Sequence, residues 1–100
     1  MPWNLLVNVD ELIGKKVVDE KAFSLGEVGG LEADTNNWAI TRLLVKLTKE
    51  AAHELGFQKR FGTPTVRMPV SLIKAVGDII TIRKSISELG KTRELVEFKE

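Results

Sequence analysis

The chain has 100 residues, of which 43% are hydrophobic and 29% charged, with a formal net charge of +1 and no cysteine. This is the composition of an ordinary folded domain, and the lack of cysteine excludes disulfides, thiolate nucleophiles and cysteine-ligated metals. No apolar run approaches the roughly 18 residues that span a bilayer, and residues 3–9 lack the basic leader and cleavage site of a signal peptide. We therefore expect one cytoplasmic domain over residues 1–100, without direct membrane insertion.

The first third of the chain predicts an apolar arm followed by short strands. Asp10 can cap a short turn that ends before Gly14, and residues 15–18 and 22–25 are typical of strands. Between Gly26 and Asp34 the alternation of apolar side chains changes parity at Gly29–Gly30. A glycine bulge at that point would reconcile the two halves of the strand.

Residues 38–47 form the longest predicted strand, with a parity change near Thr41–Arg42 that predicts a second bulge. Bulges bend a strand and increase its twist, so two in one hairpin favour a closed barrel over a flat sheet. We expect Trp38 to occupy a core position at the barrel rim, with an interface anchor as the alternative.

The middle of the chain predicts one short helix and a further strand. Thr48 is a good N-cap for residues 49–55, and Gly56 can take the left-handed position after the helix, with Phe57 folding back towards Ala52. Residues 66–70 alternate as a half-buried strand that Pro69 should end or place at an edge.

Residues 73–82 predict a hairpin around a two-residue turn at Gly77–Asp78. In that register Val76 faces Ile79 and the outermost pair is Ile73 with Ile82. The inward face would then be wholly apolar, consisting of Ile73, Ala75, Ile80 and Ile82.

The C-terminal residues predict a second capped helix and an apolar tail. Ser85 can cap residues 86–89 with Gly90 as a stop, and the tail is ordered only if something covers its apolar side chains. The predicted fold is mainly β: a small six-stranded barrel with one short helix after the third strand and short ordered terminal extensions.

Several short motifs in a fixed order carry a resemblance to a known family. They are Leu12-Ile-Gly-Lys-Lys-Val-Val-Asp19, Ser24-Leu-Gly-Glu-Val28, the strand from Trp38, Arg67-Met-Pro-Val70 and Val76-Gly-Asp-Ile-Ile80. Together they resemble the PRC-barrel family, especially its small stand-alone archaeal members. The resemblance implies a barrel over about residues 12–84, an extension over 85–100, and no catalytic role for the barrel.

The resemblance also implies a function. Stand-alone archaeal members include proteins similar to cell-division adaptors that work with SepF and FtsZ, which implies a dimeric adaptor recruited to the division site at the membrane by a partner. The barrel is more distantly similar to the C-terminal domain of RimM and to the reaction centre H subunit. The RimM likeness implies the alternative, an RNA-associated or ribosome-assembly module.

The residues themselves predict no catalytic, cofactor or metal site. His53 is the only histidine, so histidine triads and multi-histidine metal sites are impossible, and we interpret it as a helix-surface residue. Glu50 and Glu54 share a helix face, where solvated charges are far commoner than an acid and base pair. The glycines of residues 26–30 depart from nucleotide-binding patterns. A ligand inside a six-stranded barrel lacks space, so that third hypothesis is the weakest.

Two sets of residues are candidates for binding. Phosphate contacts under the RNA alternative would come from Lys59, Arg60 and Arg67, but a net charge of +1 weakens that case. The candidate protein interface consists of Leu5, Val7, Phe57, Phe61, Leu95 and Phe98. An apolar patch of this kind needs cover, either from termini that pack back on the barrel or from a second copy in a homodimer.

Overall fold

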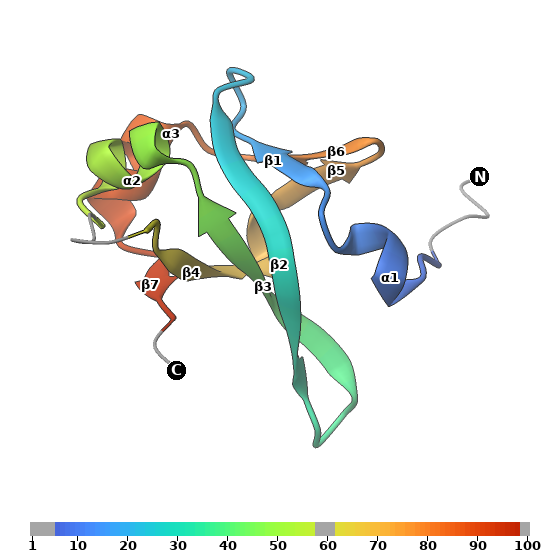
Figure 1. Ribbon diagram of the computed structural model, residues 1–100. Helices are drawn as coiled ribbons and strands as arrows, with labels where there is room; N and C mark the ends of the chain where they lie inside the picture. The colour runs from blue at the N-terminus through green and yellow to red at the C-terminus, as the bar shows by residue number, and fades with distance from the viewer. Residues whose placement is uncertain (1–5, 58–61, 99–100) are drawn as a thin grey trace.

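The computed structural model describes residues 6–57 and 62–98, which form a mainly β fold (Figure 1). Within these residues seven strands join in one sheet: β1 Lys16–Val18, β2 Ser24–Asp34, β3 Ala39–Leu47, β4 Thr65–Pro69, β5 Ile73–Val76, β6 Ile79–Ile82 and β7 Val96–Glu97. Three helices accompany them, α1 Val9–Leu12, α2 Lys49–Leu55 and α3 Ile86–Thr92, with a 3-10 turn η1 at Val70–Leu72.

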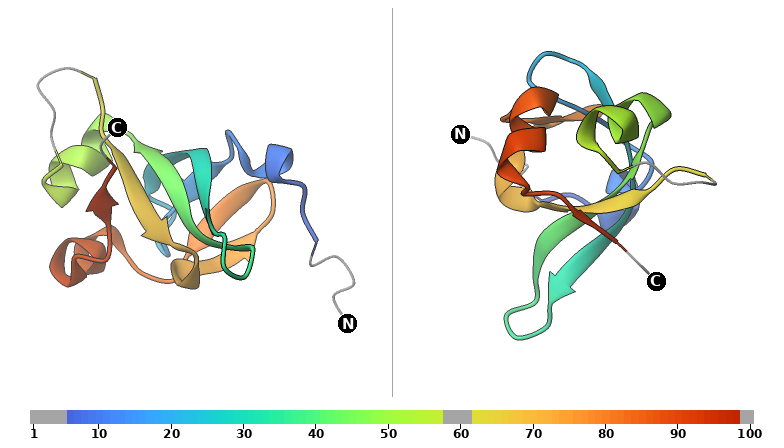
Figure 2. Two further views of the ribbon diagram at one scale, coloured as in Figure 1. Left: turned by 90° about the horizontal axis from the view of Figure 1, so that it is seen from below. Right: turned by 90° about the vertical axis from the view of Figure 1, so that its left-hand side faces the viewer.

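The expected six-stranded closed barrel is replaced by a seven-stranded open sheet. Its order is β5-β6-β1-β2-β3-β4-β7, so β5 and β7 are its edges. The extra strand arises because the chain after α3 folds back, and its Val96 and Glu97 pair with Arg67 and Val66 of β4. The sheet is strongly curled (Figure 2), and α2 follows the third strand as predicted.

The long β2–β3 hairpin contains both predicted bulges. Val28 pairs with Val45 and Gly30 with Leu44, which leaves Gly29 as the extra residue. Further out, the partner of β2 changes from Arg42 to Ile40, which leaves Thr41 unpaired. Both bulges are confirmed, and the side-chain parity of the sequence located them.

The predicted helix signals around α2 are confirmed. Thr48 Oγ1 accepts a hydrogen bond of 3.0 Å from the Ala51 N–H, and Gly56 follows the helix with φ of 79°. The Phe57 N–H donates to the Ala52 carbonyl at 2.9 Å, which closes the C-terminal end.

The other two helices differ in part from expectation. Ser85 caps α3 as predicted, and Glu88 completes a capping box. Gly90 does not stop the helix, which continues to Thr92 before Arg93 takes a left-handed conformation with φ of 55°. Glycine inside a helix costs only about 1 kcal/mol, and the buried Leu89 holds this helix against the core. Asp10 lies inside α1 and does not cap it.

The predicted register of the β5–β6 hairpin is wrong at its turn. The Gly77 N–H donates to the Ile79 carbonyl at 2.9 Å, so the turn takes three residues and Val76 pairs with Ile80. A bulge at Lys74 then restores the predicted pair of Ile73 with Ile82. As a result, Ile80 and Ile82 are fully buried and Ile73 is half-buried, whereas Ala75 is exposed and not part of the inward face.

A buried carboxylate ties the β1–β2 turn to α3. Asp19 Oδ1 accepts hydrogen bonds from the N–H groups of Lys21 and Phe23, at 2.9 and 2.8 Å, and Oδ2 accepts one from Ile86 at 2.8 Å. The residue is only 1% exposed. The hydrophobic core contains residues of the sheet together with Ala51 and Ala52 of α2 and Leu89 of α3. The core therefore extends from inside the curled sheet to α2 and α3.

Candidate functional site

The part of the molecule around α1 exposes apolar side chains. α1 has no buried residue, and Leu6 just before it is 94% exposed. Val7 and Val76 are 43% and 45% exposed. Further large apolar side chains exposed here are Val9 of α1, Ile13 directly after it and Ile79 at the start of β6. This end of the molecule lies opposite α2 and α3 (Figure 1).

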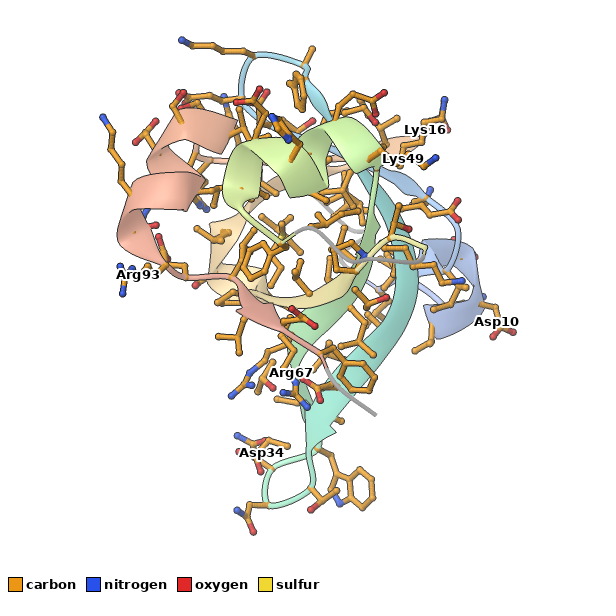
Figure 3. All side chains as sticks on the ribbon, turned by 60° about the vertical axis from the view of Figure 1, so that its left-hand side comes forward. Asp10, Lys16, Asp34, Lys49, Arg67 and Arg93 are labelled. Carbon is orange, nitrogen blue, oxygen red and sulfur yellow. The ribbon has the colours of Figure 1, made fainter. Side chains whose placement is uncertain are left out.

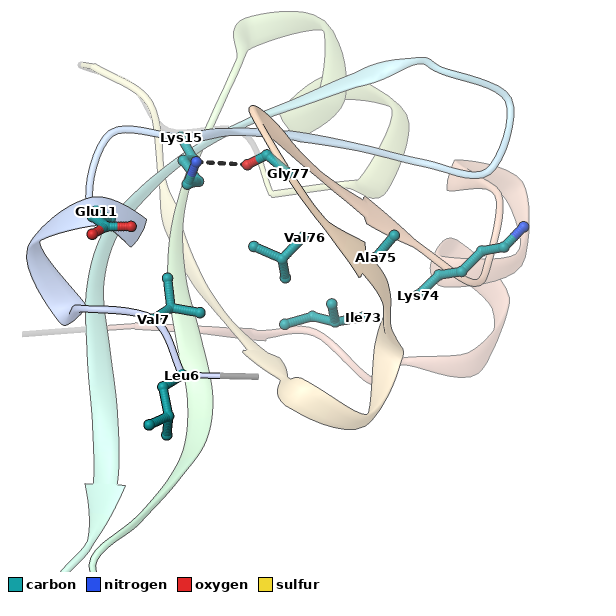
Figure 4. Close-up of a pocket in the computed structure, with 9 residues that line it drawn as sticks. All are labelled: Leu6, Val7, Glu11, Lys15, Ile73, Lys74, Ala75, Val76 and Gly77. Atoms are coloured by element: carbon teal, nitrogen blue, oxygen red, sulfur yellow. Dashed lines mark hydrogen bonds between the residues drawn. The ribbon is translucent and has the colours of Figure 1, made fainter. Parts of the chain in front are cut away.

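A groove runs between β5 and the N-terminal segment, which consists of Leu6, Val7 and the residues up to the end of α1. It has a volume of about 580 Å³ and is lined by Leu6, Val7, Glu11, Lys15 and residues 73–77. In Figure 4 the side chains of Ile73 and Val76 point from β5 towards Leu6 and Val7, whereas Lys74 points away. The groove therefore combines apolar side chains from both of its sides with the charged groups of Glu11 and Lys15. We name it the β5 groove.

Lys15 links the two sides of the β5 groove. Its Nζ donates a hydrogen bond of 2.6 Å to the Gly77 carbonyl, drawn as a dashed line in Figure 4. An ammonium group has three donors, so this bond leaves capacity for an additional acceptor. The carboxylate of Glu11 accepts a hydrogen bond of 3.1 Å from Asn8 Nδ2.

The predicted interface residues are distributed over different parts of the fold. Val7 lies in the β5 groove, and Leu5 and Phe61 lie outside the described residues. Phe57 packs half-buried against the core. Leu95 is 4% exposed and belongs to the hydrophobic core of the described chain. It is covered because the C-terminal extension packs back beside α2 and α3, which was one of the two expected ways to cover the tail.

Phe98 and Arg67 belong to a common cluster on the outer surface. Arg67 Nε lies 3.0 and 3.1 Å from the two carboxylate oxygens of Glu32. Its guanidinium carbon lies 4.9 Å from the centroid of the Phe98 ring, a cation–π geometry. Figure 3 labels Arg67 between the body of the molecule and Asp34 at the hairpin tip. Lys59 and Arg60 lie outside the described residues. Of the three predicted phosphate contacts, the structure therefore describes Arg67 alone, and its guanidinium already pairs with the Glu32 carboxylate.

Trp38 does not occupy the core position predicted for it. It is 79% exposed, with φ of 56°, at the tip of the β2–β3 hairpin. The Asp34 and Asn37 side chains accept hydrogen bonds from the N–H groups of Asn36 and Ala39, at 2.9 and 3.0 Å. These local bonds build a turn that includes Trp38 and places it beyond the reach of the core.

The β5 groove was missed from the sequence as a site. Its signal was present, because Val76 and Ile79 flank Gly77–Asp78 and cannot both face inward with Ile80. What could not be foreseen is that the N-terminal segment lies opposite β5, since that depends on the tertiary fold.

The residues considered for chemistry remain apart from the groove. His53, Glu50 and Glu54 lie on exposed positions of α2, in agreement with the surface interpretation. Among residues 6–57 and 62–98, no three histidine, aspartate or glutamate side chains gather in a group that could hold a metal ion. The helices of the same residues include none with the length and apolarity to cross a membrane.

Comparison with known proteins identifies the family. No curated protein matches the chain. The PRC-barrel domain matches residues 6–89, a range that contains Leu6, the sheet from β1 to β6 and most of α3. This match covers most of the chain, and its extent agrees with the order of the motifs along the sequence. The chain belongs to the PRC-barrel domain family.

Proposed function

We propose that this PRC-barrel chain is a non-enzymatic protein–protein interaction adaptor. The observation that supports this function is the exposed apolar surface of the β5 groove, with Leu6 almost completely exposed. Apolar side chains gathered on one surface and bordered by charges are typical of protein-binding sites. Each such side chain gains free energy when a partner removes it from water.

The adaptor is proposed to act as a homodimer. Exposed apolar side chains occur outside the β5 groove as well, at Trp38 and Ile40 of the hairpin tip. A tryptophan at the end of a projecting hairpin suits a binding contact, because tryptophan is enriched among the residues that dominate interface energies. A second copy could cover these residues while the β5 groove stays open to a different partner.

The proposed setting is the archaeal cell-division apparatus, with SepF-like or FtsZ-associated proteins as partners. The similarity to small stand-alone archaeal PRC-barrel proteins supports this setting. In this role the chain is cytoplasmic and is recruited to the division site at the membrane by its partner.

Two measurements test the proposal. Multi-angle light scattering on the purified chain should give twice the mass of 11.1 kDa, and a monomer at high concentration would contradict the dimer. Purified SepF-like and FtsZ-like proteins should be retained by the immobilised chain. Retention of neither would contradict the division role.

The variant that tests where the partner binds is Val76→Asp, which introduces a charge into the β5 groove, and its control is Val96→Asp. A partner that binds there should be lost with Val76→Asp and kept with Val96→Asp. The two valines are matched because they are 45% and 53% exposed and lie on opposite edges of the sheet.

A further inference from the structure

We propose that the β5 groove binds an extended segment of a partner protein, which adds to β5 as a further strand and carries apolar and acidic side chains in alternation. This inference rests on the proposed function, in that the ligand is a protein. It adds the mode of binding and the chemistry of the segment.

The groove follows the free edge of β5. Five consecutive residues, 73–77, line it. The side chain of Lys74 points away from the groove, so this residue lines it with its backbone, which places the groove along the edge of the strand. The position of β5 at one end of the sheet agrees with this.

The backbone of β5 offers hydrogen bonds at this edge. The Gly77 N–H points towards β6, since it donates to the Ile79 carbonyl. Neighbouring residues along an antiparallel strand turn their N–H and C=O groups to opposite sides, so those of Val76 point into the groove. Main-chain bonds of this kind provide affinity when an extended peptide joins a sheet edge.

The size of the groove favours a segment over a second copy of the chain. A fully exposed valine, leucine or isoleucine offers roughly 60–120 Å² of apolar area, so Leu6, Val7, Ile73 and Val76 at their partial exposures offer roughly 120–260 Å². A standard interface of about 800 Å² per partner contains about 450 Å² of apolar area. The groove alone is too small for a stable dimer but large enough for one strand.

The side chains of the groove define those of the ligand. Ile73 and Val76 point towards Leu6 and Val7, so ligand residues opposite them should be apolar. Lys74 points to the other face and is exposed. A ligand residue opposite Lys74 should be acidic, since opposite charges across a strand pair attract and like charges repel. Lys15, with donors to spare, adds to this preference.

The same edge resists uncontrolled association. Short length, a bulge and a lysine are the features by which proteins keep sheet edges from pairing with one another, and β5 has all three. A short segment of complementary charge can still pair with this edge, whereas the β5 strand of a second copy could pair with it over only four residues. These features favour selective binding over aggregation.

The test uses two synthetic fluorescein-labelled heptapeptides, Ile-Asp-Val-Asp-Val-Asp-Ile and its counterpart with lysine at each aspartate. Fluorescence anisotropy with the full chain should show binding of the acidic peptide and at least about fivefold weaker binding of the basic one. In nuclear magnetic resonance spectra the acidic peptide should shift the amide signals of β5 and slow hydrogen exchange at Val76.

Val76→Asp and Leu6→Asp should each weaken the acidic peptide about tenfold or more, whereas Val96→Asp on the opposite edge should leave its affinity unchanged. No binding of the acidic peptide up to millimolar concentration, or signal shifts away from β5, would overturn the inference. Equal affinity for both peptides would overturn its acidic part. If the acidic peptide does not bind while SepF-like or FtsZ-like proteins are still retained, strand addition at the β5 groove is rejected and the proposed function stands. If the peptide binds while neither protein is retained, only the proposed division partners are rejected.

Discussion

The two ends of this molecule differ in how far their side chains are buried and hydrogen-bonded. At the end formed by α2 and α3, the helices contribute Ala51, Ala52 and Leu89 to the core, and Asp19 and Ser85 are buried with hydrogen-bond partners. At the end formed by α1 and the β5–β6 hairpin, no residue of α1 is fully buried and most of β5 is exposed. Figure 3 shows this separation through Arg93 and Asp10, which lie on opposite sides.

The difference indicates that stability and recognition are assigned to separate parts of one small domain. Substitutions at the α2–α3 end should lower the free energy of unfolding, because buried polar groups and close packing lie there. Substitutions at the α1 end should leave that free energy unchanged and alter binding. Local stability in proteins is uneven, and binding surfaces are drawn from its weaker regions.

The largest effect is expected for Gly26→Ala. Gly26 has φ of 153°, and an added Cβ would lie 1.9 Å from the Lys46 carbonyl oxygen, so the β2–β3 pair must separate. We expect a loss of about 3 kcal/mol or more in the free energy of unfolding, measured by urea denaturation. The matched control is Gly29→Ala, whose Cβ would meet only the flexible Lys46 side chain at 2.9 Å and should cost about 1 kcal/mol or less. Equal losses would contradict this account.

The second largest loss in the free energy of unfolding is expected for Asp19→Ala. The substitution leaves the N–H groups of Lys21, Phe23 and Ile86 without their carboxylate acceptor in a buried site. We expect a loss of about 3 kcal/mol, seen as a decrease in Tm of about 12 °C or more. Asp10→Ala, on the exposed α1, is the control and should change stability by less than about 0.5 kcal/mol. If Asp19→Ala lowered stability no more than Asp10→Ala, the hydrogen bonds of the buried carboxylate would not stabilise the α2–α3 end.

Arg67→Ala should have an intermediate effect. The side chain pairs with Glu32 and stacks on Phe98, but it is 29% exposed, so solvent weakens the ion pair. A loss of about 1 kcal/mol in urea denaturation is expected, with part of it from the ring contact. Arg42→Ala should be nearly neutral, since Arg42 reaches Glu32 only at 4.0 Å and is 51% exposed.

A smaller effect concerns pH. The hydrogen bond from the Ser85 backbone N–H lowers the pKa of Glu88 below its ordinary value of 4.5. A carboxylate whose pKa is lower in the folded state stabilises the fold above pH 4.5 and loses that contribution as pH falls through the folded pKa. The stability difference between the wild type and Glu88→Gln should therefore be greatest near neutral pH and shrink below pH 4.5. Thermal unfolding between pH 3 and 7 measures it, and a constant difference would refute the linkage.

The smallest effect on stability is expected at the α1 end. Leu6→Ser and Val76→Thr remove exposed apolar groups that contact little in the isolated chain. Both should change the free energy of unfolding by less than about 0.5 kcal/mol. Circular dichroism during thermal unfolding would check this, and a large loss for either variant would show that this end also supports the fold.

The sequence predicted those features whose cause is local. The bulges at Gly29 and Thr41 follow from side-chain parity, and the caps at Thr48 and Ser85 follow from side-chain oxygens placed before helices. The family resemblance was confirmed as well. Local chemistry was sufficient in each of these cases.

Other features depended on competition between local and tertiary forces. The turn of the β5–β6 hairpin could take two or three residues, and the bulge at Lys74 compensated for the longer one. Trp38 is apolar enough for a core, yet the polar turn around it determined its position. β7 has two residues and no periodic pattern, so only its pairing with β4 reveals it. The β5 groove unites residues nearly seventy positions apart and has no local signature.

The parallel pairing of β1 with β6 has a consequence for the order in which the chain folds. The β2–β3 hairpin joins neighbours in sequence, but β1 must wait for residues 79–82, and Asp19 for Ile86, 67 positions away. Long-range pairs of this kind slow folding, because loop-closure entropy is lost before their contacts form. On the ribosome the hairpin can form early, whereas the β1 strand keeps an unpaired side until most of the chain has emerged. During that interval the open side of β1 carries unpaired backbone groups that another strand can contact.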